Sequence, residues 1–201
     1  MKELLKSLAK AVSLLLISPL YFVMVLSEIL VMTDQPFQGC SQLLSLFPGV
    51  PGNYLRQQFY RLSLASCPGD CCIEFGTRLN QRSIEIGHRV YIGTNCCIGA
   101  CRIEDDVLIG SNVDIISGSS QHSFDDLDTP IREQGGKLVP IVIGEDSWLG
   151  NSSVVVASVG RKSIVGAGST VVREVPPFSI AVGNPARVIK SRLPQKNSEG
   201  D

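Results

Sequence analysis

The chain has 201 residues, which is enough for one domain and a short appendage. Its composition is 44% hydrophobic but only 6% aromatic, so Val, Ile, Leu and Ala must build most of the core, as they do in a mainly β fold. The formal net charge of −1 argues against nucleic acid as a partner, because nucleic-acid-binding surfaces are strongly basic.

The N-terminal segment (1–34) is predicted to be a hydrophobic membrane-anchor helix. Residues 11–27 contain no charged side chain and follow three lysines, and such positive flanks favour the cytoplasmic side. Pro19 predicts a kink, because proline removes a backbone donor. We expect the helix to re-enter or lie on the membrane at the cytoplasmic face of the inner or plasma membrane, although its length would also let it span. A helix buried against the domain or an oligomer partner is the alternative.

Residues 35–66 are predicted to form a linker followed by an amphipathic helix. The stretch "FPGVPGNY" (47–54) carries two Pro-Gly turn signals. The stretch "YLRQQFYRLSL" (54–64) then places Arg56 and Arg61 among apolar residues, as a short amphipathic helix would. This helix either lies on a membrane surface or caps the domain that follows.

A repeat of six residues dominates the region that follows, which we assign to residues 67–190. A period of six excludes an α-helix, whose period is 3.6, and a plain alternating strand. Six residues fit one short strand and a corner, so three repeats close a triangular coil of about 18 residues with aliphatic side chains stacked inside. The sequence therefore predicts a β-helix, with inward positions at Ile73, Leu79, Ile86, Ile92, Ile98, Ile103, Ile109, Ile115, Ile143, Leu149, Val155, Val159, Val165 and Val171.

Between Ile115 and Ile141 the repeat stops, so this segment must leave the coil as a loop (117–140). Insertions in a solenoid gather on one face and often serve binding. His122 lies on this loop, and its position alone allows either a catalytic base or a solvated loop residue. A nearby carboxylate could fix its tautomer or order the loop through an Asx turn, and the candidates are Asp125, Asp126 and Asp128.

Cysteine and histidine usage argues against a metal. The seven cysteines are odd in number and show no C-x-x-C spacing, so buried, reduced thiols are expected instead of disulfides or a zinc site. A zinc hydratase of the carbonic-anhydrase type, which also uses a β-helix, would need three histidines around the metal. The chain has two, and the second, His88, is expected to be an exposed corner residue.

Three C-terminal stretches resemble the hexapeptide acyltransferases of the maltose/galactoside O-acetyltransferase type: "IVIGEDSWLGNSSVVV" (141–156), "IVGAGSTVVREVPP" (164–177) and "AVGNPARVIK" (181–190). The resemblance covers residues 72–192 and implies a left-handed parallel β-helix, a homotrimer and acetyl-CoA as the acyl donor. It also implies that His122 reaches a neighbouring subunit and acts there as general base. Imidazole suits this role, because it can accept the proton of a sugar hydroxyl and return it to the leaving thiolate.

The resemblance further implies which residues bind coenzyme A. The single tryptophan would lie along the catalytic groove, with packing on the coil surface as the alternative. Small residues at the corners would line the pantetheine arm, and basic residues would meet the phosphates, where arginine offers a planar fork and lysine a point charge. The predicted positions are Trp148, Gly150, Asn151 and Ala167 along the arm, and Arg173, Arg187 and Lys190 near the phosphates.

Two departures from the family pattern concern the acceptor. The stretch "YIGTNC" (91–96) has Gly93 where the family often has the first asparagine of a pair, and keeps only Asn95. The short helical acceptor-binding segment of the soluble members is replaced here by the hydrophobic N-terminus, so we expect a different, membrane-associated acceptor. The predicted catalytic residues are His122, Asp125 and Asn95.

The prediction is therefore an acetyl-CoA-dependent O-acetyltransferase that acts by direct transfer on a sugar hydroxyl of a glycan or polysaccharide, including a lipid-linked one. The alternatives are an N-acyltransferase acting on an amino sugar and a non-catalytic β-helix that serves as a scaffold or binds glycans. A base on a loop needs an opposing wall, which a neighbouring coil supplies, so a C3 homotrimer is expected. The C-terminal tail (191–201) carries no predicted role.

Overall fold

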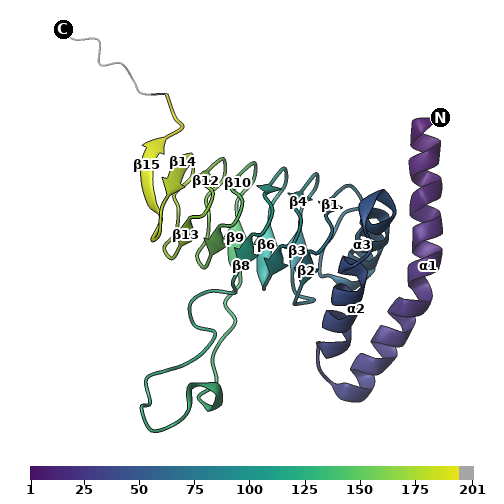
Figure 1. Cartoon of the computed structure of the whole chain (residues 1–201), viewed down its shortest axis with the longest axis horizontal. Helices are drawn as coiled ribbons and strands as arrows, with labels where there is room; N and C mark the ends of the chain where they lie inside the picture. The colour runs from purple at the N-terminus through teal and green to yellow at the C-terminus, as the bar shows by residue number, and fades with distance from the viewer. Residues whose placement is uncertain (195–201) are drawn as a thin grey trace.

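The computed structural model describes residues 1–194 and contains three α-helices followed by a long solenoid of short strands (Figure 1). Most of the predicted tail therefore lies outside the described residues. The helical elements are α1 (Lys2–Val31), α2 (Gln35–Ser45), α3 (Gly49–Ser63) and the short 3-10 helix η1 (Ile131–Glu133).

The strands form three sheets that the chain visits in turn, as the predicted triangular coil requires. Neighbouring strands are parallel, except for the final antiparallel pair β14–β15. Sheet 1 contains β1 (Cys72–Ile73), β4 (Tyr91–Ile92), β7 (Leu108–Ile109), β10 (Trp148–Leu149), β12 (Ile164–Val165), β14 (Ser179–Val182) and β15 (Arg187–Ser191). Sheet 2 contains β2 (Arg78–Leu79), β5 (Cys97–Ile98), β8 (Asp114–Ile115), β11 (Val154–Val155) and β13 (Thr170–Val171), and sheet 3 contains β3 (Glu85–Ile86), β6 (Cys101–Ile103) and β9 (Ile141–Ile143).

The predicted six-residue pattern is confirmed as the pattern of the core. In each two-residue strand the first side chain faces outward and the second is buried, as in β4, where Tyr91 is 38% exposed and Ile92 is fully buried. Tyr91 pairs with Leu108 in the next coil, 17 residues later, and Trp148 pairs with Ile164, 16 residues later. Every predicted inward position is buried, because each aliphatic side chain stacks on its equivalent in the next coil.

Helices α2 and α3 cover the first coil, so the expectation of a linker before residue 54 is wrong. The physical reason is a buried aromatic cluster, in which the ring centroids of Phe37 and Phe59 lie 5.8 Å apart and those of Phe59 and Tyr60 lie 5.3 Å apart. The two Pro-Gly signals fall at the start of α3, where proline is tolerated because the first turn lacks helical acceptors for its amides. Ser41 of α2 accepts the backbone N–H of Leu79 at 3.0 Å, which satisfies a donor on the open edge of the solenoid.

Arg56 joins this helical cap to the first coil. Its side chain is fully buried and donates to the carbonyl oxygens of Ile73 at 2.7 Å, Leu44 at 3.1 Å and Phe47 at 2.7 Å. Two of these acceptors belong to the end of α2 and the turn after it, where helical carbonyls lack intrahelical partners. The sequence allows this amphipathic segment either to lie on a membrane surface or to cap the solenoid, and its packing is that of a cap.

Helix α1 forms the outermost layer at the N-terminal end of the molecule and bends near its middle, where Pro19 lies within the helix (Figure 1). Residues Glu3–Val31 are long and apolar enough to cross a membrane, and little of this stretch is buried. Signal sequences and core helices of soluble proteins share this property, so it does not by itself establish an anchor.

Candidate functional site

The predicted loop is an antiparallel excursion that leaves sheet 2 after β8 and returns to sheet 3 at β9. Figure 1 shows it projecting far from the coil. Backbone hydrogen bonds join its two arms, from Val139 N–H to Ser117 O at 3.1 Å and from Lys137 N–H to Ser120 O at 2.7 Å. Because the arms are hydrogen-bonded in this way, the histidine-bearing arm has a defined position.

His122 lies on the outgoing arm, is exposed to solvent, and is next to the hydrogen bond from Ser123 N–H to Gly135 O that joins the two arms at 3.0 Å. A Cβ atom built on Gly136 of the returning arm would lie 1.9 Å from the carbonyl oxygen of Gln121 and 2.8 Å from the amide nitrogen of His122. Only glycine permits this approach without displacing the backbone around His122.

The acidic residues after His122 differ in what they contact. Asp126 accepts hydrogen bonds from the Thr129 hydroxyl at 2.7 Å and the Asp128 backbone N–H at 2.9 Å, so it orders the tip of the loop through an Asx turn. These bonds hold the pKa of Asp126 below its ordinary value. Within residues 1–194, no hydrogen bond joins the His122 imidazole to Asp125, Asp126 or Asp128, so the role expected for Asp125 stays a prediction.

A groove of about 470 Å³ lies at the base of the loop, over sheet 2. It extends from α2 across β2, β5 and β8 to the loop, and most of its polar groups are uncharged side-chain amides. Gln38 of α2 is held there by a 3.1 Å bond to the carbonyl oxygen of Asn80. The lining includes Gln38, Asn80, Gln81, Asp114, Gln121 and Leu138, and sequence reasoning missed this set because residues from α2, two coils and the loop meet only in the fold.

Asn95 lies at a different corner, between sheets 1 and 2. Its φ of 56° is the left-handed conformation that asparagine tolerates, and its backbone N–H donates to Phe75 O at 2.9 Å. A Cβ on Gly93 would lie 2.7 Å from the carbonyl carbon of Gly110, so a larger residue at this position would displace the backbone of the next coil. The departure from the family pattern thus falls where the coils stack tightly.

The residues predicted to line the pantetheine arm lie together on sheet 1 and the corner that follows it. Trp148 is on the outer face of β10, 47% exposed, between the outward side chains of Leu108 and Ile164. At the corner, the Asn151 side-chain oxygen accepts the Ser111 backbone N–H at 3.0 Å. A Cβ on Gly150 would lie 2.5 Å from the backbone nitrogen of Ala167, so these two predicted residues stack directly on each other.

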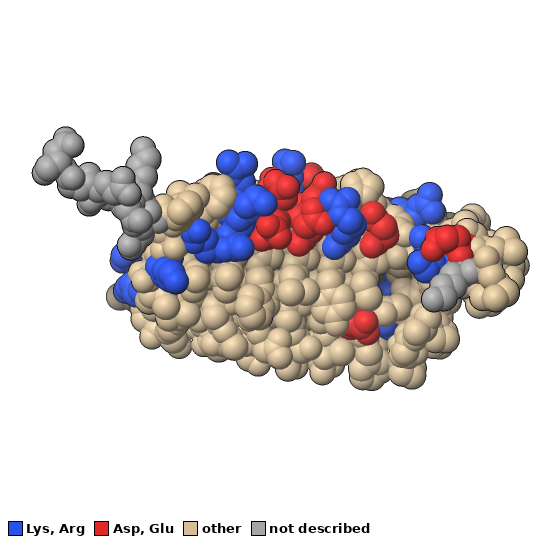
Figure 2. Space-filling model, turned by 90° about the horizontal axis from the view of Figure 1, so that it is seen from above, with Lys and Arg blue, Asp and Glu red and all other residues tan. Residues whose placement is uncertain are grey.

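The three predicted phosphate-binding residues do not come together. Arg187 and Lys190 are exposed on β15 in sheet 1, whereas Arg173 follows β13 at the corner between sheets 2 and 3. Arg192 is close to the first two in sequence and donates to Lys162 O at 2.6 Å. In Figure 2 the charged side chains gather in a band along one edge, with basic groups toward the C-terminal end.

Within one chain, the candidate base and the tryptophan lie on different sides of the solenoid. The loop leaves from the corner between sheets 2 and 3, while Trp148 and its neighbours occupy sheet 1 and its corner with sheet 2. Sheet 2 lies between the corner where the loop leaves and the sheet that carries Trp148.

Other candidate chemistry is sparse in the described part of the chain. His88 is exposed at a coil corner, as predicted, and its Nδ1 lies 3.0 Å from the Asp70 carboxylate. A groove of about 370 Å³ on sheet 3 is lined by acidic residues and Arg102 but holds no predicted site residue. No three His, Cys, Asp or Glu side chains within residues 1–194 are placed to hold a metal ion.

Comparison with known proteins identifies the family. The family described as a hexapeptide repeat of succinyl-transferase matches residues 140–173. A provisionally named acetyltransferase of Saccharomyces cerevisiae is 32% identical over 150 residues, which cover 71% of this chain and 74% of the yeast protein. The chain therefore belongs to the hexapeptide-repeat acetyltransferase family, and the predicted class of enzyme, an acyltransferase, is confirmed at this level.

Solved structures agree with the fold. A maltose O-acetyltransferase of Clostridium difficile has a TM-score of 0.67 at 24% identity, covering 83% of this chain and 90% of that one. A hexapeptide-repeat-containing acetyltransferase of Vibrio cholerae also has a TM-score of 0.67, at 26% identity and covering 83% and 94%, and it has been solved in complex with acetyl coenzyme A. The chain spans about half the length of several other curated relatives, 44% of one and 55% of others.

Proposed function

We propose that this chain is an acetyl-CoA-dependent O-acetyltransferase that modifies a sugar hydroxyl of a glycan or polysaccharide. The observation that carries the proposal is the position of His122, which is exposed on the loop next to Gln121, and Gln121 is one of four carboxamide side chains that line the groove. The family membership and the acetyl coenzyme A complex of the Vibrio relative support the choice of donor.

His122 acts as the general base in this proposal. Its imidazole accepts the proton of the acceptor hydroxyl while the hydroxyl oxygen attacks the thioester carbonyl carbon. The carbon–sulfur bond then breaks, the acetyl group stays on the sugar oxygen, and the imidazolium returns the proton to the thiolate of coenzyme A. The transfer is direct, so no acetyl group is carried by the enzyme.

The acceptor occupies the groove at the base of the loop. Carboxamides both donate and accept hydrogen bonds, so Gln38, Asn80, Gln81 and Gln121 match the paired donor and acceptor character of sugar hydroxyls. Because the groove begins at α2, the acceptor enters from the helical end of the molecule, which fits a lipid-linked glycan.

The donor binds along sheet 1 of a neighbouring copy, in a C3 homotrimer of left-handed coils. Trp148, Gly150, Asn151 and Ala167 line the pantetheine arm, and Arg187 and Lys190, with Arg173 at a separate corner, bind phosphate oxygens. The separation of the loop from Trp148 within one chain supports this arrangement, because a second copy is needed to bring the base and the donor together.

The enzyme is proposed to work at the cytoplasmic face of the inner or plasma membrane, held there by its N-terminal segment. Acetyl-CoA is a cytosolic metabolite, so the loop and sheet 1 must face the cytosol. The exposed apolar surface of α1 supports an anchoring role.

The test is acetyl transfer by the purified protein to a panel of glycans, followed by mass spectrometry. The wild type should add one acetyl mass to a defined sugar, and His122→Ala should lower kcat/KM by about 10²–10⁴. His88→Ala is the matched control, since the second histidine lies at a distant corner and should leave activity unchanged. Transfer only to amino groups would redirect the proposal to N-acylation, and absence of transfer to any glycan would leave the scaffold or glycan-binding alternative.

A further inference from the structure

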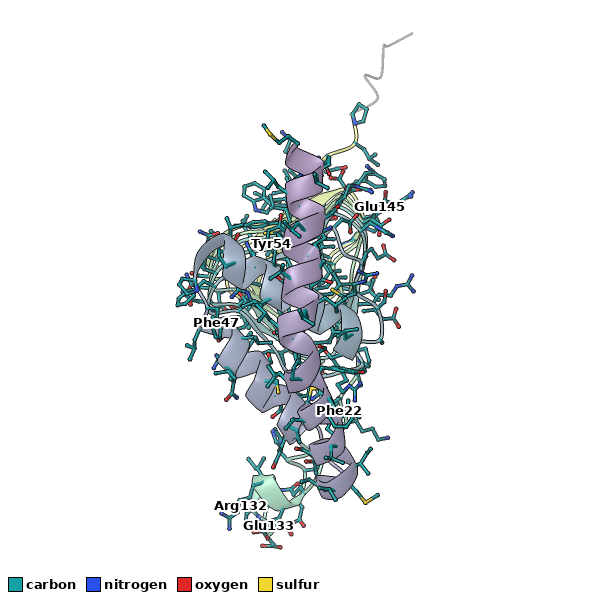
Figure 3. All side chains as sticks on the ribbon, turned by 90° about the vertical axis from the view of Figure 1, so that its right-hand side faces the viewer. Phe22, Phe47, Tyr54, Arg132, Glu133 and Glu145 are labelled. Carbon is teal, nitrogen blue, oxygen red and sulfur yellow. The ribbon has the colours of Figure 1, made fainter. Side chains whose placement is uncertain are left out.

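Most of α1 faces away from the rest of the protein. Ile17 and Met24 are buried against the helical cap, whereas Leu15 is 73% exposed, Phe22 70% and Leu30 76%. Figure 3 looks onto this end and shows α1 crossing the front of the molecule, with the other helices behind it. An apolar surface along a whole helix is far larger than the patches that soluble monomers leave in water.

Two hydroxyl groups of the same stretch are paired within the helix. Pro19 has no N–H, so the carbonyl oxygen of Leu15 loses its normal helical donor, and the Ser18 hydroxyl donates to it at 3.0 Å instead. The Ser27 hydroxyl likewise donates to Val23 O at 2.8 Å. Hydrocarbon demands such internal pairing, because it offers no partner to a free polar group.

Both ends of the apolar stretch are fixed to the same end of the solenoid. The Lys10 ammonium donates to Gly69 O at 2.5 Å, just before the first strand. Glu28, 12% exposed in its side chain, forms a 2.5 Å salt bridge with Arg82 in the first coil. The 18 residues that separate Lys10 from Glu28 span about 27 Å of helix, so these two tethers hold nearly the full apolar length against the protein.

These tethers decide between the membrane arrangements that the sequence leaves open. If α1 crossed a bilayer while keeping its contacts, the helices α2 and α3 that pack along it between the two tethers would enter the hydrocarbon with their polar side chains, which is strongly unfavourable. A helix that lies parallel to the bilayer surface keeps both tethers on the aqueous side and still buries its exposed face.

We propose that α1 binds a lipid bilayer surface lengthwise, as an in-plane helix, and does not cross the membrane. The occupant is lipid and not a second copy of the chain, because a contact between two helices covers a narrow stripe of side chains. The exposed residues of α1 instead occupy most of its circumference. The proposal takes membrane association from the proposed function and adds the geometry.

The first test is flotation of the full chain with vesicles of phosphatidylcholine and phosphatidylglycerol. Wild-type protein should float, and the double variant Leu15→Glu, Phe22→Glu should bind at least ten-fold more weakly with an unchanged circular dichroism spectrum. Leu193→Glu is the control, because it adds a charge at an exposed apolar position at the opposite end of the chain. Wild-type protein that stays in the aqueous fraction overturns the proposal, as does a double variant whose only change is a smaller oligomer.

The second test is protease protection of tags at the two ends of the chain, in sealed membrane vesicles of both orientations. An in-plane helix leaves the N-terminal and C-terminal tags on the same side, so both are cleaved together or protected together. Opposite protection would show a spanning helix and refute the geometry. Acetyl transfer to a soluble sugar is measured on the same preparations, so a failure of the enzymatic proposal is seen separately from a failure of membrane binding.

Discussion

Replacing Gly136 by alanine tests whether the loop positions His122. The new Cβ would lie 1.9 Å from the carbonyl oxygen of Gln121, and it cannot stay closer than 3.0 Å, so the arms must separate by about 1.1 Å at the point where His122 is held. A displacement of about 1 Å in a catalytic group can cost 10²-fold in rate. We therefore expect kcat/KM to fall by about 100-fold in Gly136→Ala.

The assay is the initial rate of coenzyme A release with the acceptor identified by mass spectrometry, together with thermal unfolding of each variant. The melting temperature should change little, because the loop lies outside the stacked core. Gly39→Ala is the matched control, since a Cβ on this helical glycine meets no atom within 4 Å. Full activity in Gly136→Ala with an unchanged melting temperature would refute the idea that the paired arms set the position of the base.

Three further predictions concern stability, loop order and thiol reactivity. Arg56→Met should lower the free energy of unfolding by about 2–6 kcal/mol in denaturant titrations, because two buried carbonyl oxygens lose their donor. Arg61→Met is the control and should have little effect, because Arg61 is exposed. The pKa of Asp126 is lowered, so its ordering of the loop is present above its ordinary pKa and is lost as the pH falls through the lowered value. Proteolysis of the loop should therefore rise at that acidic pH in the wild type. Asp126→Ala should be cleaved faster at every pH, whereas Asp128→Ala should behave like the wild type. Burial raises the pKa of Cys101 to about 12, so maleimide should label this thiol only after unfolding, and rapid labelling of the native protein would contradict its burial.

Much of the solenoid could be predicted because its core is periodic. Most inward aliphatic residues, such as Ile92 and Val165, are six positions from the next, and this period indicates which side chains are buried and where the chain must leave the coil. The helical cap could not be predicted in the same way. The Pro-Gly signals argue for turns, and only packing of Phe37 against Phe59 and the buried bonds of Arg56 explain why the segment is helical.

By itself, the sequence determined the six-residue period, the buried aliphatic positions, the position of the loop and the family resemblance, because these depend on spacing along the chain. Only the tertiary structure decided which surfaces the site residues share. It placed Trp148 on sheet 1, His122 on the loop that leaves after sheet 2, and Gln38 beside Asn80 in the groove. The physical reason is that a coil brings together residues about 17 positions apart and separates neighbours onto different faces, so proximity in space is set by the number of residues per turn and by the cap.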